Sequence, residues 1–283
     1  MNANYFESII PNVNNVFFSP SFLMRGDKLK YVTPDGDIIS KESTLRLYRN
    51  LRISNVLEVI KRKTIQFDEP TRWNDPFEKL FYQNVVNCGG RNYYVVCLCF
   101  CYDAVQGEES MWNIHSNDTT PSTPDMYVVR GSFDMLNLCK SLAKANSDIE
   151  FYVAPVNYSK GRKEILQAKQ RRVESGYTAI YEFIGDMLLK RKAFSYEKEI
   201  RLFGVSERPF KVNGGFTHIR LNNRNTGFIT SLTLPPAPIP LINHNASSYH
   251  QDLEKNGNLL KSYLRSNGYK NIIYLSRLYD IMG

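Results

Sequence analysis

Residues 93–102 limit the possible folds more than any other segment, because they read YYVVCLCFCY and carry no charged side chain. A short, continuous apolar run rich in β-branched and aromatic residues is typical of a strand that lies inside a protein. Because no position offers a polar face to water, both faces of this strand need cover. The sequence therefore predicts a central strand of a sheet, with further layers packed on each side.

Three of the five cysteines alternate along this run, at Cys97, Cys99 and Cys101. Alternate side chains of a strand point to the same face, so the three thiols are expected on one side of the sheet. The odd number of cysteines and the lack of a second Cys or His pair at ligand spacing favour buried free thiols over disulfides or a metal site. We expect a reducing, cytoplasmic environment and no bound metal.

Several short strand patterns surround the central run, and they predict an α+β fold with a mixed, largely antiparallel central sheet and flanking helices. The patterns are too closely spaced and too irregularly interrupted for a doubly wound parallel sheet. The expected strands are residues 45–49, 64–67, 126–130, 151–158, 216–221 and 229–234.

Helical patterns lie between these strands. A short amphipathic helix is expected to open near Ser54, a second to carry Trp112, and a third to follow Ser132 as its cap. A long helical region is expected over residues 160–192, and a C-terminal helix and strand over residues 247–276. These helices would cover the faces of the sheet.

The chain is long enough for one sizeable core. We expect residues 1–43 to form an N-terminal extension with a hairpin, because strand-like segments flank the turn sequence TPDG at 33–36. Residues 44–283 are then a single α+β domain. No run of about 18 apolar residues occurs and the N-terminus lacks the pattern of a secretory signal, so a soluble protein is predicted.

The chain is basic, with 36 Lys and Arg against 28 Asp and Glu, a formal net charge of +8. Basic residues concentrate in residues 160–172 (KGRKEILQAKQRR) and 190–192. A helix with this sequence either presents a positive stripe to phosphates or is an ordinary solvated face. Anionic partners, DNA or RNA above all and an acidic protein next, are therefore expected, without one of them being identified.

The segment SYEKEIR at residues 195–201 carries the most chemical information. If it is a strand, Glu197, Glu199 and Arg201 share one face. Two carboxylates so placed repel each other unless a cation or a ligand lies between them. The segment is thus either part of a binding cleft, or a charged strand face, or an internal salt bridge to Arg201 or Arg49.

Three further positions could contribute to a polar cleft. Arg49 ends the first long strand, where its guanidinium could clamp a phosphate or pair with a carboxylate. Asn74 and Asp75 lie on a proline-stiffened loop, which suits either ligand binding or an Asx turn. Trp112 could stack on a planar ring or serve as a buried anchor.

The common catalytic signatures are missing from the sequence, which has no glycine-rich phosphate loop, GxSxG, HExxH or CxxC motif. Histidine-dependent hydrolysis is disfavoured, and carboxylate-centred chemistry is favoured. The chain has only four histidines, none spaced for a metal: His115, His218, His244 and His250.

Taken in order, the strings YR, IQFDEPTRWNDPFE, VVCLCF, SMW, KAFSYEKEIRL and ITSLTL resemble the microbial and phage family known as domain of unknown function 2971. The resemblance covers residues 45–234. It departs from the family pattern at Ile200, where the family usually has tryptophan, and in the residues that follow Trp112.

The order of an arginine on a first strand and a glutamate on a late strand also resembles the ADP-ribosyltransferase superfamily. This resemblance implies an ADP-ribosyltransferase-like fold, NAD as substrate, Glu199 as the catalytic glutamate and Arg49 as the dinucleotide-binding arginine. The sequence has Gln66-Phe67-Asp68 where the superfamily has Ser-Thr-Ser. Cofactor contacts are expected from Tyr48, Phe67, Asn74, Asp75, Trp112, Tyr196 and Glu197.

Three functions remain open from the sequence. The first is an NAD-dependent enzyme that transfers ADP-ribose to a nucleic acid or protein, as a toxin or phage-defence effector. The second is a non-catalytic nucleotide or nucleic-acid binding module that uses the same cleft. The third is a metal-dependent nuclease in which Glu197, Glu199 and Asp75 surround a divalent cation.

Overall fold

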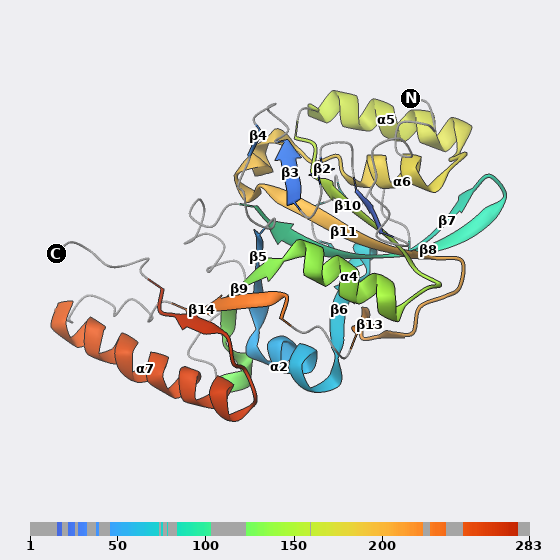
Figure 1. Cartoon of the computed structure of the whole chain (residues 1–283). Coiled ribbons are helices and arrows are strands. Elements are labelled where there is room, and N and C mark those ends of the chain that lie inside the picture. Colours follow the sequence, from blue (N-terminus) through green and yellow to red (C-terminus); the bar gives the residue numbers. More distant parts are fainter. Residues whose placement is uncertain are drawn as a thin grey trace.

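A mixed sheet of twelve strands forms the centre of the molecule, as the computed structural model shows (Figure 1). The structure describes residues 16–18, 22–25, 28–32, 38–39, 46–73, 75, 78, 84–102, 123–158, 160–222, 227–235 and 246–276.

Antiparallel pairing dominates this sheet, and only the β1–β10 and β14–β15 pairs are parallel. The predicted α+β class with a largely antiparallel central sheet is therefore confirmed. The strands along the main path, in spatial order, are β1 (Val16–Phe18), β10 (Glu150–Pro155), β11 (Glu199–Ser206), β8 (Arg91–Cys101), β5 (Arg46–Arg52), β9 (Val128–Asp134), β14 (Ile229–Thr233) and β15 (Ile272–Tyr274).

Strand β8 forks the sheet. One edge of β8 pairs with β11 over its length, whereas three strands share the other edge: β5 at Cys101, β6 at Cys97 and β7 from Tyr94 to Arg91. The strands β5 and β6 are joined by helix α2 and diverge from each other, so β13 pairs with the far edge of β6. The additional strands are β6 (Thr64–Asp68), β7 (Val85–Cys88), β12 (Val212–Asn213) and β13 (Phe216–Arg220).

Two hydrophobic clusters cover the two faces of the sheet. On β8, Val96, Leu98 and Phe100 belong to one cluster, and Val95 and Cys97 belong to the other. Helices α2 (Ile53–Arg62), α4 (Met135–Ala145) and α7 (Ala246–Ser266) contribute to the first cluster, and α5 (Arg162–Ser175) and α6 (Ile180–Met187) to the second. The central strand is thus buried on both faces, as predicted. Each large apolar side chain buried there contributes roughly 1.5–3 kcal/mol.

All five cysteines are free, and four of them are buried, with Cys99 half-buried. Cys97 belongs to the second cluster and Cys99 packs against it, as alternation along a strand requires. The prediction of buried free thiols is confirmed.

The N-terminal segment forms a separate small sheet of three antiparallel strands. Its strands are β2 (Phe22–Arg25), β3 (Lys28–Val32) and β4 (Ile38–Ile39). Strands β3 and β4 pair antiparallel on either side of the segment expected as a turn, which itself lies outside the described residues. Short 3₁₀ turns connect other elements, namely η1 (Pro70–Arg72), η3 (Pro124–Met126) and η4 (Lys192–Glu197). No helix in the described part of the chain combines the length and apolar character needed to cross a bilayer.

Of the two predicted helix starts, one is confirmed and one is wrong. Helix α2 begins at Ile53, next to the expected start near Ser54, and no side chain caps it. Ser132 lies inside β9, where it pairs with Tyr48, and the cap of α4 is Asp134, whose carboxylate accepts a hydrogen bond from Asn137 N at 3.1 Å. Pairing with β5 therefore holds Ser132 in the sheet ladder and leaves the capping role to the residue next to the helix.

The long helical region expected over residues 160–192 is two helices. Helix α5 ends at Ser175, and the following residue, Gly176, has a positive φ of 67° that a residue with a side chain rarely adopts. Helix α6 then begins at Ile180 and ends at Met187, so Lys190 follows the helix as part of a loop. This break places Lys190 over the sheet instead of on a helical surface.

Candidate functional site

A polar cavity of about 410 Å³ lies at the fork where β5 and β6 separate along β8. Its volume is within the range of about 300–1,000 Å³ typical of small-molecule and cofactor sites. Strand ends and two loops supply its walls. The lining residues are Tyr48, Arg49, Asn50, Asp68, Trp73, Glu78, Cys99, Phe100, Cys101, Arg130, Lys190, Glu197, Glu199 and Arg201.

Arg49 closes the fork and lines the cavity at the same time. Cys99 lies between Cys97, which pairs with β6, and Cys101, which pairs with β5. The Arg49 Nη1 atom donates a hydrogen bond to the Cys99 carbonyl at 2.7 Å, and Nη2 is 3.4 Å from an Asp68 carboxylate oxygen. The guanidinium thus supplies the donor that a third strand would otherwise provide. The expected phosphate clamp and the structural alternative for Arg49 are therefore compatible.

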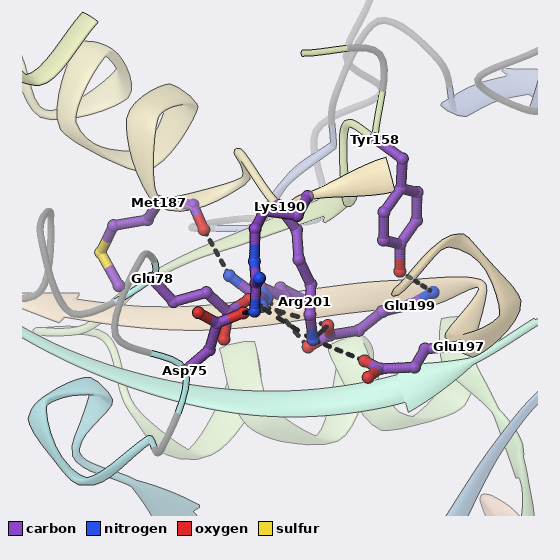
Figure 2. A network of polar contacts seen from close by, with 9 residues as sticks. Asp75, Glu78, Tyr158, Met187, Lys190, Glu197, Glu199 and Arg201 are labelled. Carbon is purple, nitrogen blue, oxygen red and sulfur yellow. Dashed lines mark hydrogen bonds and ion pairs between the residues drawn. The ribbon is translucent and has the colours of Figure 1, made fainter. Parts of the chain in front are cut away.

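A buried ionic network forms the opposite wall (Figure 2). Arg201, only 1% exposed, binds the Glu199 carboxylate with two donors, from Nε at 2.9 Å and from Nη2 at 3.0 Å. The same guanidinium donates to Glu78 and to the carbonyl of Met187, and it lies 4.2 Å from the centre of the Trp73 ring. A bidentate pair of this kind fixes both orientation and charge.

Lys190 joins three carboxylates. Its ammonium lies 3.0 Å from Glu199 and 3.4 Å from Glu78, and it also donates to Glu197. The repulsion between Glu197 and Glu199 required an intervening cation or ligand, and Lys190 is that cation. The internal salt bridge to Arg201 that the sequence left open is also present, so the carboxylate pair has a structural partner as well as a cavity to face.

The protein surroundings shift the pKa values of these groups. Burial acts to raise the pKa of Glu199, but Arg201 and Lys190 outweigh it and hold that pKa well below the usual 4.5. Burial raises the pKa of Glu197, and Lys190 offsets this only in part. Burial acts to lower the pKa of Lys190, yet the carboxylates of Glu199 and Glu78 raise it above 10.5. At neutral pH Lys190 and Glu199 are therefore both charged.

Glu197 and Glu199 do not share a strand face, so the strand expected over residues 195–201 is wrong in its first half. Glu197 ends the 3₁₀ turn η4, Lys198 has a positive φ of 45°, and β11 begins only at Glu199. The backbone N–H of Glu199 donates to the Tyr158 hydroxyl at 3.1 Å, outside the regular ladder (Figure 2). The two carboxylates therefore approach Lys190 from two different elements.

Of the other predicted cofactor contacts, some line the cavity and others lie outside it. Tyr48 lines the cavity, and the Arg130 guanidinium lies 5.3 Å from the centre of its ring. Phe67 is fully buried in the hydrophobic core, because its side chain points to the opposite face from Asp68, which does line the cavity. Its expected place in a nicotinamide pocket does not match this position.

Asp75 pairs with Arg191 at 3.1 Å and is not among the residues that line the cavity. Tyr196 is 42% exposed on η4, also outside the lining residues. Asn74 and Trp112 lie outside the described residues. The structure therefore brings together Tyr48, Arg49, Glu197 and Glu199 from the predicted set.

Several lining residues were missed by the sequence analysis, namely Glu78, Arg130 and Trp73, and Lys190 was taken for part of a surface cluster. Glu78 is the last residue of the NDPFE string, which offered a signal for it. No local signal marks Lys190 as buried.

The described residues do not form the metal site that the nuclease alternative requires. Within that part of the chain, no group of three or more His, Cys, Asp or Glu side chains is placed to hold a metal ion. The three carboxylates considered for it are each paired with a protein cation, Glu197 and Glu199 with Lys190 and Asp75 with Arg191.

Fold and site together define an α+β protein with a largely antiparallel sheet and a bipolar, charged cavity at the sheet fork. No protein-family model matches the chain, so the resemblance to the domain of unknown function 2971 family is not confirmed. No curated protein matches either.

Among solved structures, the chain is similar to DarT from Thermus sp. 2.9. The complex with carba-NAD⁺ shares 7% identity, covers 84% of this chain and 98% of that one, and gives a TM-score of 0.35. The complex with ADP-ribosylated ssDNA shares 9% identity, covers 88% and 98%, and gives a TM-score of 0.34. Similarity of this size assigns neither an activity nor a ligand to the chain.

Proposed function

We propose that this protein is an NAD-consuming, ADP-ribosyltransferase-like enzyme. The observation that carries the proposal is the separation of charge within one cavity. Arg49 and Arg130 belong to β5 and β9, whereas Glu199 begins β11 and Glu197 ends the turn η4 just before it. Three strand spacings, about 14 Å in all, separate β9 from β11. A nucleotide can span such a distance and a single small ion cannot.

The chemistry of NAD suits both ends of the cavity. Guanidinium groups bind pyrophosphate oxygens through charge-assisted hydrogen bonds, a role for Arg49 and Arg130. The Tyr48 ring offers a planar surface to a base. Carboxylates at the other end stabilise the positive charge that develops on the nicotinamide ribose, as Glu197 and Glu199 are placed to do.

The proposed reaction breaks the bond between C1′ of the ribose and the nicotinamide nitrogen. The bonding electron pair goes to the nicotinamide ring, which leaves as a neutral molecule, and C1′ becomes oxocarbenium-like. A nucleophile of the acceptor then forms a new bond to C1′ and loses its proton to a base. The carboxylate wall stabilises the intermediate charge, and the arginines fix the rest of the dinucleotide in place.

The charge of the surface supports an anionic acceptor. Arg162, Lys163 and Arg171 are exposed on α5, and Lys192 is exposed on η4 beside the site. With a net charge of +8, such a surface attracts polyphosphate chains. A nucleic acid is therefore the acceptor we propose, and modification of a nucleic acid would suit a toxin or phage-defence effector.

The test is release of free nicotinamide from NAD by the purified full chain, measured by chromatography with and without DNA, RNA or cell lysate. A variant carrying both Glu197→Gln and Glu199→Gln removes the acidic wall, and Glu254→Gln, the same change at an exposed position of α7, serves as a matched control. We expect release by the wild type and the control, and none by the double variant. No release by the wild type under any of these conditions would overturn the proposal.

One observation favours a second candidate, a nucleotide-binding module without catalysis. Both carboxylate oxygens of Glu199 are already bound to protein cations, as in a purely structural salt bridge. Under this alternative, calorimetry detects NAD binding that Arg49→Met weakens, while nicotinamide is never formed.

A further inference from the structure

We propose that Glu197 is the carboxylate that contacts the bound ligand, whereas Glu199 is a positioning residue that holds Lys190 and Arg201. This assignment rests on the proposed NAD chemistry and reverses the roles expected from the sequence, where Glu199 is catalytic. It follows from counting which carboxylate oxygens still have room for a donor.

Both carboxylate oxygens of Glu199 are held by buried protein cations. Its Oε1 atom accepts from Arg201 Nε, and its Oε2 atom accepts from both Lys190 Nζ and Arg201 Nη2. A carboxylate has about four lone-pair sites, and these three donors already occupy both oxygens. With 8% of its side chain exposed, Glu199 presents little of its surface to a ribose hydroxyl.

The Glu197 carboxylate can accept further hydrogen bonds. Within the described part of the chain, its carboxylate is bound by Lys190 alone, through Oε2, and its Oε1 atom accepts no hydrogen bond. The side chain is 20% exposed and lines the cavity. An incoming hydroxyl can therefore bind Glu197 without breaking an existing interaction.

The electrostatics of the network favour the same residue. Among the described residues, the buried network contains two cations, Lys190 and Arg201, and three carboxylates, Glu78, Glu197 and Glu199, which leaves one negative charge in excess. Arg201 binds Glu78 and Glu199 directly and does not bind Glu197. The excess charge is thus concentrated on Glu197, where it faces the cavity and a developing cation on the ribose.

The backbone explains why the Glu197 carboxylate can accept a ligand while the Glu199 carboxylate is held by protein cations. Glu199 belongs to β11, where strand pairing fixes its side chain over the sheet. Glu197 belongs to η4, and the left-handed residue Lys198 turns the chain between the two. Lys190 then holds Glu197 at the cavity wall from the other side (Figure 2).

The experiment compares Glu197→Gln with Glu199→Gln, two identical chemical changes in the full chain. Nicotinamide release is measured as kcat and KM from pH 5 to pH 9, and the melting temperature of each variant is recorded. For Glu197→Gln we expect a kcat lowered about 100-fold or more, a melting temperature close to that of the wild type, and loss of the acidic limb of the pH profile.

For Glu199→Gln we expect a clearly lower melting temperature, because Arg201 and Lys190 lose a shared partner, while the residual activity keeps the acidic limb. Added formate should restore turnover to Glu197→Ala, whose missing group leaves a space open to the cavity, and should not restore it to Glu199→Ala. If Glu199→Gln fails to fold, Glu197→Gln and the formate rescue of Glu197→Ala still decide the matter.

A Glu197→Gln variant with the kcat and acidic limb of the wild type would overturn this assignment and leave NAD cleavage intact. Formate rescue of Glu199→Ala but not of Glu197→Ala would overturn it in the same way. If the wild type releases no nicotinamide, the proposed function fails instead and the assignment fails with it.

Discussion

Replacing Lys190 by methionine removes the cation on which three buried carboxylates depend. Lys190 is 7% exposed, and its ammonium contacts Glu78, Glu197 and Glu199. Methionine keeps a side chain of similar length against the ring of Phe194, which the Lys190 ammonium approaches at 5.2 Å. The substitution therefore tests charge with little change in volume.

The expected loss of stability is large. Breaking a buried ion pair by removing one partner costs about 3–5 kcal/mol, because the other charge stays buried without compensation. After Lys190→Met, Arg201 is left to neutralise the network of three carboxylates. For a chain of this size 1 kcal/mol corresponds to roughly 2 °C, so the melting temperature should fall by about 6–10 °C.

The pKa shifts predict how the stability loss of Lys190→Met changes with pH. In the wild type the raised pKa of Lys190 means that its contribution is fully present below 10.5, and the lowered pKa of Glu199 means that its contribution is present above 4.5 and is lost only in strong acid. Without Lys190 the carboxyl pKa values rise. Protonation then relieves the repulsion, so the deficit of the variant should be largest near pH 7 and shrink toward pH 5.

Scanning calorimetry of the wild type, Lys190→Met and Lys192→Met at pH 7 and pH 5 measures this difference. Lys192 lies two residues away, at the start of η4, and is exposed, so its substitution should change the melting temperature by less than about 1 °C. Equal melting temperatures for Lys190→Met and the wild type at pH 7, or a deficit that grows toward pH 5, would refute the proposed role of the amine.

Three further predictions concern other parts of the fold. Gly131→Ala should destabilise the protein by about 1–3 kcal/mol in urea unfolding, because a new Cβ would lie 2.7 Å from the buried Phe133 ring; unchanged stability would show that this ring can move. Asp134→Ala should cost about 1 kcal/mol through loss of the α4 cap, and Asp134→Asn should recover most of it. Burial raises the pKa of Cys88 to about 11 and that of Cys139 further still, so iodoacetamide at pH 8 should label neither thiol in the native protein, as mass spectrometry can check against a denatured sample.

Local patterns in the sequence were sufficient for most strands, because alternation and apolar runs depend on neighbouring residues alone. The run at residues 93–102, the strand that carries Tyr48 and the alternating thiols were all placed correctly. The side-chain period of two also accounts for an error. Phe67 and Asp68 are adjacent and point to opposite faces of β6, and which of them faces the cavity depends on the layer that packs against the strand.

The ionic network could not be derived in the same way. Lys190 lies in a basic string, LKRK, that is typical of a solvated surface, and only the break between α5 and α6 brings it over the sheet. Its partner Glu78 reaches Arg201 across 123 positions of the chain. The sequence showed that Glu197 and Glu199 needed a cation. The identity of that cation depended on tertiary structure.

The fork at β8 has a consequence for how the chain folds during synthesis. Residues 91–101 leave the ribosome long before β11, which covers one whole edge of this strand and ends at Ser206. Until then the most apolar segment of the protein has an unpaired edge, the kind of exposure that promotes aggregation of nascent chains. Folding should therefore be slow and dominated by non-local pairing, and successful expression should depend on chaperones or on low temperature during translation.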